Sequence, residues 1–412
     1  MKQTLYFLLI SLLAVTPLRL AAAAAETKTE AKPGTAAKTA ENKAAPGKSA
    51  AKDAKETSKQ NDKAAPKKAE EDPKQKEEKK AQWIEQTLDY GIQEERLTAV
   101  NGIQQIKDPA IRARLVKKLL DVVKDEEEPE LLVKTITVLG EMKETSAIPI
   151  MTAKLDHRSE DVCVAAIYAL KKTKAMTAKE KLIQKLKSRD LGKNSNLTSA
   201  LIQTLGEFKA VETVPFARES IESPKTNMAI KEELVIFLGK AQSQDSKGVL
   251  LKIFKDEDEN VTLRAFAVNS LAKIGAKDAA PDIKDVIKTI DSYELKKRKK
   301  YYTLYLYSIA ALATLGDPDA IPKLINALRH NSSQVRLKAI SLIKDFKDKR
   351  TIDILKYKMK NDQSAKVQSA ARKALKEMGV DVGEDPNEAK KDVKKDAAKT
   401  DDKKRNDTNK KK

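Results

Sequence analysis

Apolar residues recur along residues 81–379 in one short pattern that repeats eight or nine times. Each unit is centred on one apolar anchor position. Consecutive anchors lie mostly 31–36 residues apart, with one step of 41 between the sixth and the seventh. A repeat of this length indicates a solenoid, in which each unit buries its apolar face only against its neighbours. The anchors are Ile103, Leu139, Leu170, Leu205, Leu238, Leu271, Leu312, Ile343 and Leu375.

Two apolar stripes in each unit indicate two helices. Apolar or small residues eight and four positions before the anchor share one helical face with it, as in Val335, Ala339 and Ile343. In four units a proline stands ten positions after the anchor, which suits the first turn of a second helix. These prolines are Pro149, Pro215, Pro281 and Pro322. The pattern predicts an all-α protein, a stack of eight to nine helix hairpins.

Two stretches of this pattern resemble HEAT repeats of the short type found in bilin-lyase-like proteins. They are VRLKAISLIKDFKD, residues 335–348, and ALATLGDPDAIPKLINALRHNSSQVR, residues 311–336. The resemblance covers roughly residues 82–379. It implies a right-handed α-solenoid whose concave side is lined by the helices that bear Arg264 and Arg336. HEAT repeats as a class bind other macromolecules, and the fold names no ligand.

The first 25 residues have the pattern of an export signal. Lys2 is followed by an apolar core at residues 5–15 and by small residues at 21–25, where we expect cleavage. The apolar stretch is short for a bilayer span, although an uncleaved N-terminal anchor is the alternative. The pattern predicts export to the periplasm or cell envelope of a bacterium.

Composition separates two tails from the repeats. Residues 26–80 are an Ala, Lys, Glu and Pro segment, and residues 380–412 are highly charged; both contain too few large apolar residues to fold, so we expect them to be disordered. The chain has 81 basic and 61 acidic residues, a net charge of +20, of which about +12 lies on residues 81–379. This excess favours an acidic partner or an anionic polymer. The only cysteine, Cys163, excludes an intramolecular disulfide.

The long step before Leu312 contains the most unusual chemistry of the chain. About eight extra residues fall in segment 291–307, where a basic run precedes a group of tyrosines. Because insertions in repeats usually form loops on the binding face, we expect a partner-binding loop. In the alternative, Leu304, Ser308 and Leu312 continue the core stripe while the tyrosines flank it and the basic run is solvated. The candidate residues are Tyr293, Lys296, Lys297, Arg298, Lys299, Lys300, Tyr301, Tyr302 and Tyr305, with Tyr307 following.

Four cations lie seven positions before an anchor, namely Arg96, Lys231, Arg264 and Arg336. Such a ladder can bind phosphates or carboxylates, and Arg264 and Arg336 are therefore candidate partner-binding residues. We favour the alternative in which these arginines pair with acids or carbonyls of neighbouring units. The acidic runs at 125–128 and 256–259 lack the spacing of a calcium loop and suit helix N-termini.

The sequence predicts no enzyme activity, no metal site and no cofactor. The two histidines, His157 and His330, are followed by Arg and Asn, so the His-Glu pairs of iron-binding HEAT hydroxylases are absent. Zinc-ligand spacings, phosphate-binding glycine loops and nucleophile elbows are absent as well.

These patterns favour an exported, non-enzymatic scaffold or adaptor that binds a protein partner through its concave face and segment 291–307. The alternative is an electrostatic binder of an anionic polymer, such as an envelope polysaccharide, a lipid headgroup or a nucleic acid. A purely structural spacer is a third, weaker possibility. The identity of the partner and the oligomeric state do not follow from the sequence.

Overall fold

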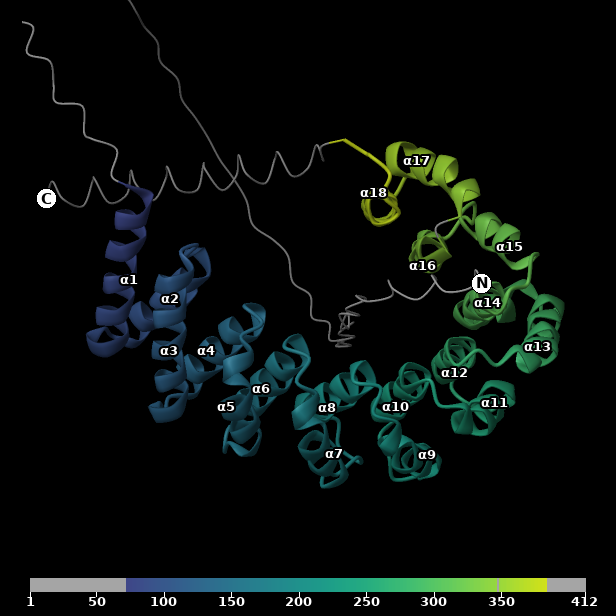
Figure 1. The fold of residues 1–412 in the computed structure, drawn as a ribbon. Helices are drawn as coiled ribbons and strands as arrows, with labels where there is room; N and C mark the ends of the chain where they lie inside the picture. Colours follow the sequence, from purple (N-terminus) through teal and green to yellow (C-terminus); the bar gives the residue numbers. More distant parts are fainter. Residues whose placement is uncertain (1–71, 347, 384–412) are drawn as a thin grey trace, which may run out of the picture. The chain divides into compact units, whose positions relative to one another are not determined.

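The computed structural model describes residues 72–346 and 348–383, and all its regular elements are helical (Figure 1). Nine hairpins follow one another, each made of an odd-numbered and an even-numbered helix. The odd-numbered helices are α1 (Pro73–Tyr90), α3 (Pro109–Asp125), α5 (Ile148–Ala153), α7 (Lys179–Lys187), α9 (Val214–Glu222), α11 (Lys247–Lys255), α13 (Ala280–Ser292), α15 (Ala320–Ala327) and α17 (Ile352–Asn361). The even-numbered helices are α2 (Gln93–Gly102), α4 (Pro129–Glu141), α6 (Glu160–Lys172), α8 (Asn196–Glu207), α10 (Met228–Ala241), α12 (Val261–Lys273), α14 (Leu295–Leu315), α16 (Ser333–Ile343) and α18 (Ala365–Glu377).

The predicted two-helix unit is confirmed in the structure. Eight of the nine anchors lie within even-numbered helices and Ile103 directly follows α2; all nine are at most 3 % exposed. Pro149, Pro215 and Pro281 stand at the second position of α5, α9 and α13, where a missing N–H leaves no helical hydrogen bond unmade. The described residues thus form the predicted all-α solenoid.

The even-numbered helices form a continuous row on the inner side of the stack, with the odd-numbered helices outside (Figure 1). The close approach in this row depends on small residues. A Cβ atom added to Gly140 of α4 would lie 2.7 Å from both Cα and Cβ of Ala169 on α6. A Cβ at Gly239 of α10 would similarly lie 2.8 Å from Cα of Ser270 on α12. Glycine is therefore required at these two contacts for steric reasons.

Most even-numbered helices end in the same left-handed turn, four residues after the anchor. Gly275, Gly316 and Gly379 occupy this position after α12, α14 and α18, with φ of 73°, 96° and 81°. In four earlier hairpins a side-chain-bearing residue adopts the same conformation, at Lys143, Lys174, Lys209 and Gln242. A left-handed residue ends a helix and turns the chain towards the next odd-numbered helix.

The first hairpin begins earlier than the predicted boundary at residue 81. Helix α1 starts at Pro73, because the Asp72 carboxylate accepts a hydrogen bond from the Lys74 N–H at 3.1 Å and proline suits the first turn. Glu77 then accepts hydrogen bonds from the N–H groups of Lys107 and Asp108 at 3.0 and 2.8 Å. Residues 73–80 therefore belong to the repeats, and their assignment to the linker was wrong.

The last hairpin also extends slightly past its predicted end. Val380 and Val382 pack partly buried against the core, and Arg372 donates hydrogen bonds to the carbonyls of Val382 and Gly383 at 3.0 and 3.2 Å. The predictions for residues 1–71 and 384–412 concern parts of the chain outside the described residues. Within residues 72–383, no helix combines the length and apolar character that a bilayer span needs.

We expect Gly140→Ala to lower the free energy of unfolding by about 1–3 kcal/mol, because the new methyl group overlaps Ala169 in the row of even-numbered helices. Gly248→Ala on α11 is the matched control, since nothing lies within 4 Å of its added Cβ. That change should raise stability by about 0.5 kcal/mol through helix propensity. Urea unfolding followed by circular dichroism measures both, and equal effects would contradict the packing argument.

Candidate functional site

The insertion before Leu312 lengthens a helix hairpin and does not form the predicted loop. Leu312 is the eighteenth residue of α14, whereas Leu271 is the eleventh of α12. The seven extra residues lie before Leu304, the first residue of the apolar stripe, and add nearly two turns to the N-terminal end of the helix. Helix α13 is also longer than α11, with 13 residues instead of 9.

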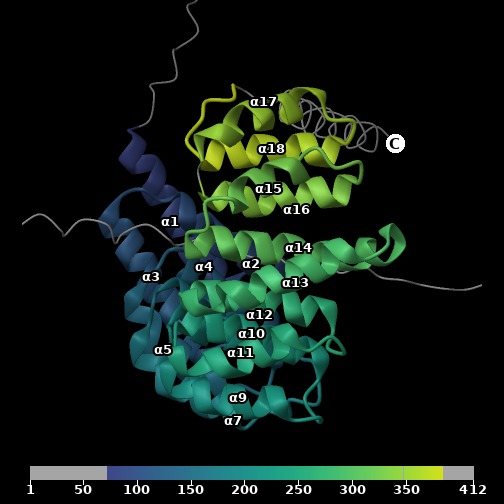
Figure 2. The same ribbon diagram turned by 90° about the vertical axis from the view of Figure 1, so that its right-hand side faces the viewer.

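The lengthened hairpin projects beyond the neighbouring helices, as Figure 2 shows for α13 and α14. We call residues 291–302 the α13–α14 tip. Seven residues of helix correspond to an extension of roughly 10 Å. The tip has five basic and two acidic residues, and Leu295 at its end is 64 % exposed. The tip therefore presents a basic surface with one exposed apolar side chain at its end.

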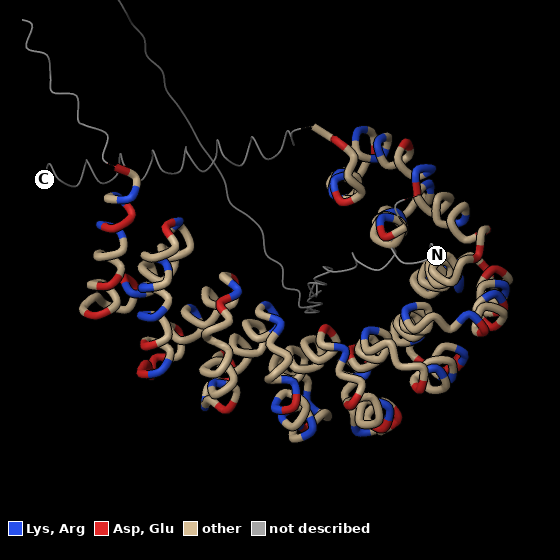
Figure 3. Tube along the Cα trace, in the orientation of Figure 1, with Lys and Arg blue, Asp and Glu red and all other residues tan. Residues whose placement is uncertain are grey.

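The tip concentrates lysines that take no part in the ion pairs between hairpins. Among the described residues, no carboxylate lies within ion-pair distance of the lysines 296, 297, 299 and 300. Elsewhere lysines link consecutive hairpins, as in the Lys255–Asp282 and Lys284–Asp317 pairs, both 2.7 Å. Figure 3 shows both signs of charge along the outer helices. The tip lysines are thus free of a stacking role.

The tyrosines support the tip and are not its exposed part. Leu304, Ser308 and Leu312 are buried, as in the alternative interpretation of this segment. The ring of Tyr293 lies edge-on to that of Tyr301 at 5.1 Å, and Lys297 Nζ is 3.7 Å from the Tyr293 centroid. The other three tyrosines are also half-buried against the core. The ring centroids of Tyr302 and His330 lie 4.7 Å apart, and the Tyr307 ring packs on Phe266. Burial raises the pKa of Tyr305.

The predicted cation ladder is a structural feature at the fourth position of the even-numbered helices. Its side chains donate to carbonyls near the end of the odd-numbered helix in the same hairpin. Arg96 Nε donates to Leu88 O at 3.1 Å, and Arg264 Nε to Phe254 O at 2.9 Å. Cys163 Sγ and Gln368 Nε2 occupy the same position and bond to the Leu155 and Asp362 carbonyls. Lys231 makes no such contact.

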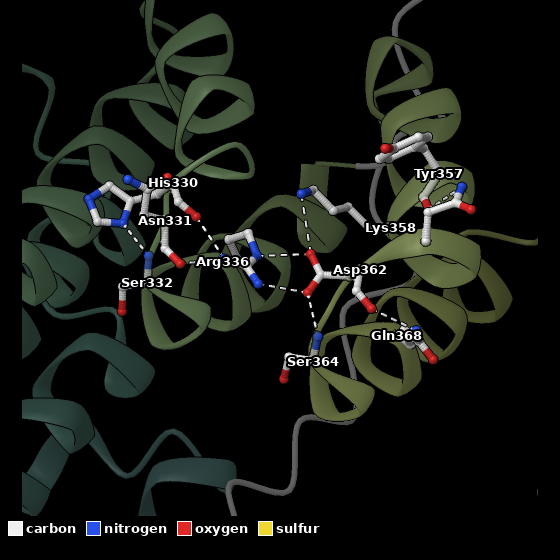
Figure 4. A network of polar contacts seen from close by, with 10 residues as sticks. His330, Asn331, Ser332, Arg336, Tyr357, Lys358, Asp362, Ser364 and Gln368 are labelled. Carbon is white, nitrogen blue, oxygen red and sulfur yellow. Dashed lines mark hydrogen bonds and ion pairs between the residues drawn. The ribbon is translucent and has the colours of Figure 1, made fainter.

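Two of these arginines also bind a carboxylate at the end of the next odd-numbered helix. Arg96 Nη2 lies 2.6 Å from Glu126, and Arg336 binds Asp362 with two hydrogen bonds of 2.9 and 2.7 Å (Figure 4). Arg336 further donates to the His330 and Asn331 carbonyls, and it is 8 % exposed. Its proposed role in partner binding is therefore wrong, because its donors are used inside the stack. Arg264 is buried too, and it lacks the second contact.

A row of side chains on the inner layer was missed by the sequence reasoning. Five positions before the anchor stand Glu233, Phe266, Tyr307 and Lys338, on the consecutive helices α10, α12, α14 and α16. The Phe266 and Tyr307 rings meet edge-on at 6.0 Å, and Lys338 Nζ donates to the Tyr307 hydroxyl at 2.7 Å. The row could have been found by comparing equivalent positions between repeats rather than residues within one segment.

Glu233 and its neighbour Glu232 are half-buried on α10. Glu233 Oε2 is buried without a hydrogen-bond partner, and neither carboxylate forms an ion pair with a described residue. Burial raises the pKa of both groups; for Glu233 a hydrogen bond from Ser199 opposes this rise, and the Glu232 charge adds to it. On α6, burial and the nearby Glu233 raise the pKa of Tyr168. This part of the inner layer therefore carries uncompensated negative charge.

Similarity to known proteins agrees with the repeat pattern. Residues 293–376 match the family model of HEAT repeats, so the predicted resemblance is confirmed for this part of the chain. No curated protein is detectably similar to the chain in sequence.

Several solved structures are similar to the chain at low identity and low TM-score. The CpcE–CpcF complex of phycocyanin lyase from Nostoc is 16% identical over 69% of this chain and 99% of that one, with a TM-score of 0.35. An Escherichia coli protein, YibA, is 16% identical over 68% and 99%, with a TM-score of 0.38. Human deoxyhypusine hydroxylase is 14% identical over 74% and 98%, with a TM-score of 0.26. Likeness at this level does not transfer an activity.

The described residues contain no group of three or more His, Cys, Asp or Glu side chains that could hold a metal ion. The enzymes among the similar structures are a lyase and a hydroxylase. The absence of enzyme activity in this chain stays a prediction.

Asp362→Asn should lower the free energy of unfolding by about 3 kcal/mol, because it leaves the buried Arg336 guanidinium without its counter-charge. Burial opposes ionisation of Asp362, but its hydrogen bonds from Arg336, Ser364 and Lys358 outweigh this and lower its pKa. The stabilisation is therefore present above the unfolded pKa of about 3.9 and is lost as pH falls towards the folded value. Urea unfolding between pH 7 and 3 tests both effects; the exposed Asp245→Asn is the control. If Asp362→Asn lost as much stability as the wild type between pH 7 and 3, the acid dependence could not be assigned to Asp362.

Glu233→Gln should raise the melting temperature at pH 7, because it removes a half-buried charge that no cation balances. A raised folded-state pKa means that the wild-type protein gains stability as pH falls through that value towards about 4.3. The variant should lose part of this gain. Thermal unfolding at pH 7 and pH 5 measures the difference, with the exposed Glu219→Gln as control. An unchanged melting temperature and pH dependence would disprove the burial cost.

Proposed function

We propose that the chain is an exported, non-enzymatic scaffold or adaptor that docks a protein partner on the α13–α14 tip and the adjoining inner layer. One observation carries the proposal. The tip is a two-turn helix extension whose lysines have no carboxylate partner among the described residues and whose outermost apolar side chain, Leu295, is exposed. The neighbouring hairpins stack without such an extension.

The charge of the tip is unfavourable for the helix that carries it. Residues 296–300, the second to sixth of α14, are all basic, and the first turn of α14 contains no acid. Cations at a helix N-terminus oppose the helix dipole and repel one another. A sequence that retains this local cost points to a role outside the stack. An acidic surface on a partner would offset the repulsion.

The inner layer favours a protein over a uniformly anionic polymer. Its row of Glu233, Phe266, Tyr307 and Lys338 combines both charges with two aromatic rings. The uncompensated carboxylates at 232 and 233 would repel a polyanion. Protein interfaces, in contrast, commonly combine aromatic anchors with polar groups of both signs.

Export is supported by the first 25 residues, with Lys2, the apolar stretch 5–15 and the small residues at 21–25. We place the protein in the periplasm or cell envelope of a bacterium. Cys163 is the only cysteine of the sequence, so in an oxidising compartment it has no disulfide partner within the chain; it is buried and its Sγ donates to the Leu155 carbonyl. Fractionation of cells, with the N-terminus of the recovered protein determined by mass spectrometry, tests this location.

An anionic polymer is the second candidate, because the free tip lysines would suit it as well. The two candidates differ in salt dependence. Binding to a polyanion through several lysines should weaken by orders of magnitude between 50 and 200 mM salt. A protein interface centred on Leu295 and the aromatic row should weaken much less.

Photo-crosslinking from position 295 tests the docking surface. We expect one discrete protein adduct, and at least a tenfold loss of it when the lysines 296, 297, 299 and 300 are changed to Glu. This variant should fold, since acidic residues suit a helix N-terminus. The control changes four exposed lysines without ion pairs, at 117, 124, 187 and 225, to Glu, and it alters the net charge equally.

The captured protein is then purified, and its affinity for both variants is measured. An adduct that survives reversal of the tip charges, or one that is lost equally in the control, would contradict docking at the tip. Adduct formation only with polysaccharide, lipid or nucleic acid would instead favour the second candidate.

A further inference from the structure

Arg264 is buried but lacks a counter-charge. Its side chain is on the fourth residue of α12, and the residue is 3 % exposed. Nε donates to Phe254 O at 2.9 Å, and the two Nη groups make no hydrogen bond or ion pair with the described residues. Neither Nη atom is sealed from solvent, since neither is among the buried side-chain atoms without a partner. The guanidinium thus retains donors that point into accessible space.

That space is a small cavity of about 30 Å³ at the base of the α13–α14 tip. Arg264 lines it together with Thr289 and the rings of Tyr293 and Tyr301. Lys255 also borders the cavity, but its ammonium is paired with Asp282 at 2.7 Å. Glu257 borders it from the α11–α12 loop and forms no ion pair with Arg264. Arg264 is therefore the uncompensated cation of the cavity.

The same chain shows twice what normally fills this position. The residue that directly follows the next odd-numbered helix is Glu126 opposite Arg96 and Asp362 opposite Arg336, and each carboxylate binds its arginine. Opposite Arg264, the residue that follows α13 is Tyr293. Its ring is held by Tyr301 and Lys297, so the phenol replaces the acid. One arginine of the three is left with donors and no carboxylate.

We infer that Arg264 is the centre of a carboxylate-binding pocket, and that its ligand is an Asp or Glu side chain of the docked partner. The source of the carboxylate rests on the proposed function, whereas the pocket itself does not. A carboxylate presents two oxygens to the planar guanidinium fork, as Asp362 does for Arg336. The tyrosine rings and the α13 side chains Val286 and Ile290 would shield such a contact in part from solvent and so strengthen it.

The position of the pocket fits the docking surface. Tyr293 and Tyr301 belong both to the pocket lining and to the tip that carries the free lysines. An acidic segment lying along residues 296–300 would pass the mouth of the cavity at the base of the same hairpin. The lysines would supply long-range attraction, and Arg264 would fix one side chain of the segment in place.

The test uses the purified full chain and two neutral-ended peptides, acetyl-Gly-Glu-Gly-amide and acetyl-Gly-Gln-Gly-amide, at matched ionic strength. At 50 mM, the Glu peptide should raise the melting temperature by about 2–4 °C and the Gln peptide should not. Inorganic phosphate is the third probe. Equal shifts with both peptides, or a shift with phosphate and none with the Glu peptide, would overturn a carboxylate site.

Two variants of Tyr293 keep Arg264 intact. Tyr293→Asp restores the acid found in the other two hairpins, so an internal carboxylate should occupy the guanidinium and abolish the response to the Glu peptide. Tyr293→Phe retains the ring and should respond like the wild type. A full response in Tyr293→Asp, or in Arg264→Gln if that variant folds, would overturn the assignment.

These results are independent of the crosslinking at Leu295. If the Glu peptide gave no shift but the partner adduct still formed, the carboxylate pocket would be disproved and the proposed docking would stand. If the Glu peptide gave a shift but no protein adduct formed, the carboxylate pocket would stand and the proposed docking would be disproved.

Discussion

The structure depends on the fact that no single hairpin can bury its own apolar stripe. The anchors from Ile103 to Leu375 become inaccessible only because each even-numbered helix lies against the next one in the row. The row sets how close the helices come, and at Gly140 and Gly239 the backbone itself is in contact with the neighbouring helix. Every other feature of the repeats is arranged around this contact: the left-handed turn four residues after the anchor, the proline that starts the next helix, and the buried fourth-position side chains.

The same constraint limits where the repeats can vary. An even-numbered helix can be lengthened without disturbing the row only outside its apolar stripe, because an insertion within the stripe would rotate part of it away from the neighbouring helices unless it added whole turns. The seven extra residues of α14 meet this condition, and the surplus turns extend past the edge of the stack. They leave the anchor contacts intact and create a surface that the neighbours do not cover. One helix can therefore keep the anchor contacts that stabilise the stack and also carry an additional exposed surface.

The sequence predicted the features that packing in the row requires. It did not predict features that depend on the local geometry of one hairpin. Anchors and prolines recur at fixed spacing, so the two-helix unit followed from the spacing alone. The eight extra residues before Leu312 were interpreted as a loop, because a length difference does not distinguish a loop from added turns. The tyrosines were predicted to bind a partner from that loop, whereas the rings of Tyr293 and Tyr301 pack against each other at the end of the hairpin. Whether an arginine has a carboxylate partner depends on residues 26 or more positions away, as in Arg336 and Asp362, and became visible only in the folded chain.

Comparison between equivalent positions of the same chain was more informative than any single motif. It separates Arg96 and Arg336, which bind a carboxylate within the stack, from Arg264, whose Nη groups have no acceptor among the described residues. It also separates the lysines that link hairpins from those of the tip. The α13–α14 hairpin thus differs from its neighbours in its run of lysines without a carboxylate partner as well as in its length. A binding role for this hairpin explains both differences, whereas a role in stacking explains neither.

Removal of the extension tests this interpretation most directly. A variant lacking residues 296–302 loses seven residues, about two turns, and should keep the apolar stripe of α14 in phase. The decisive measurement is the dissociation constant of the crosslinked partner for this variant, with its folded state verified by circular dichroism. We expect a folded stack that binds at least ten times more weakly than the wild type. A folded variant with unchanged affinity would show that the extension is not the docking surface.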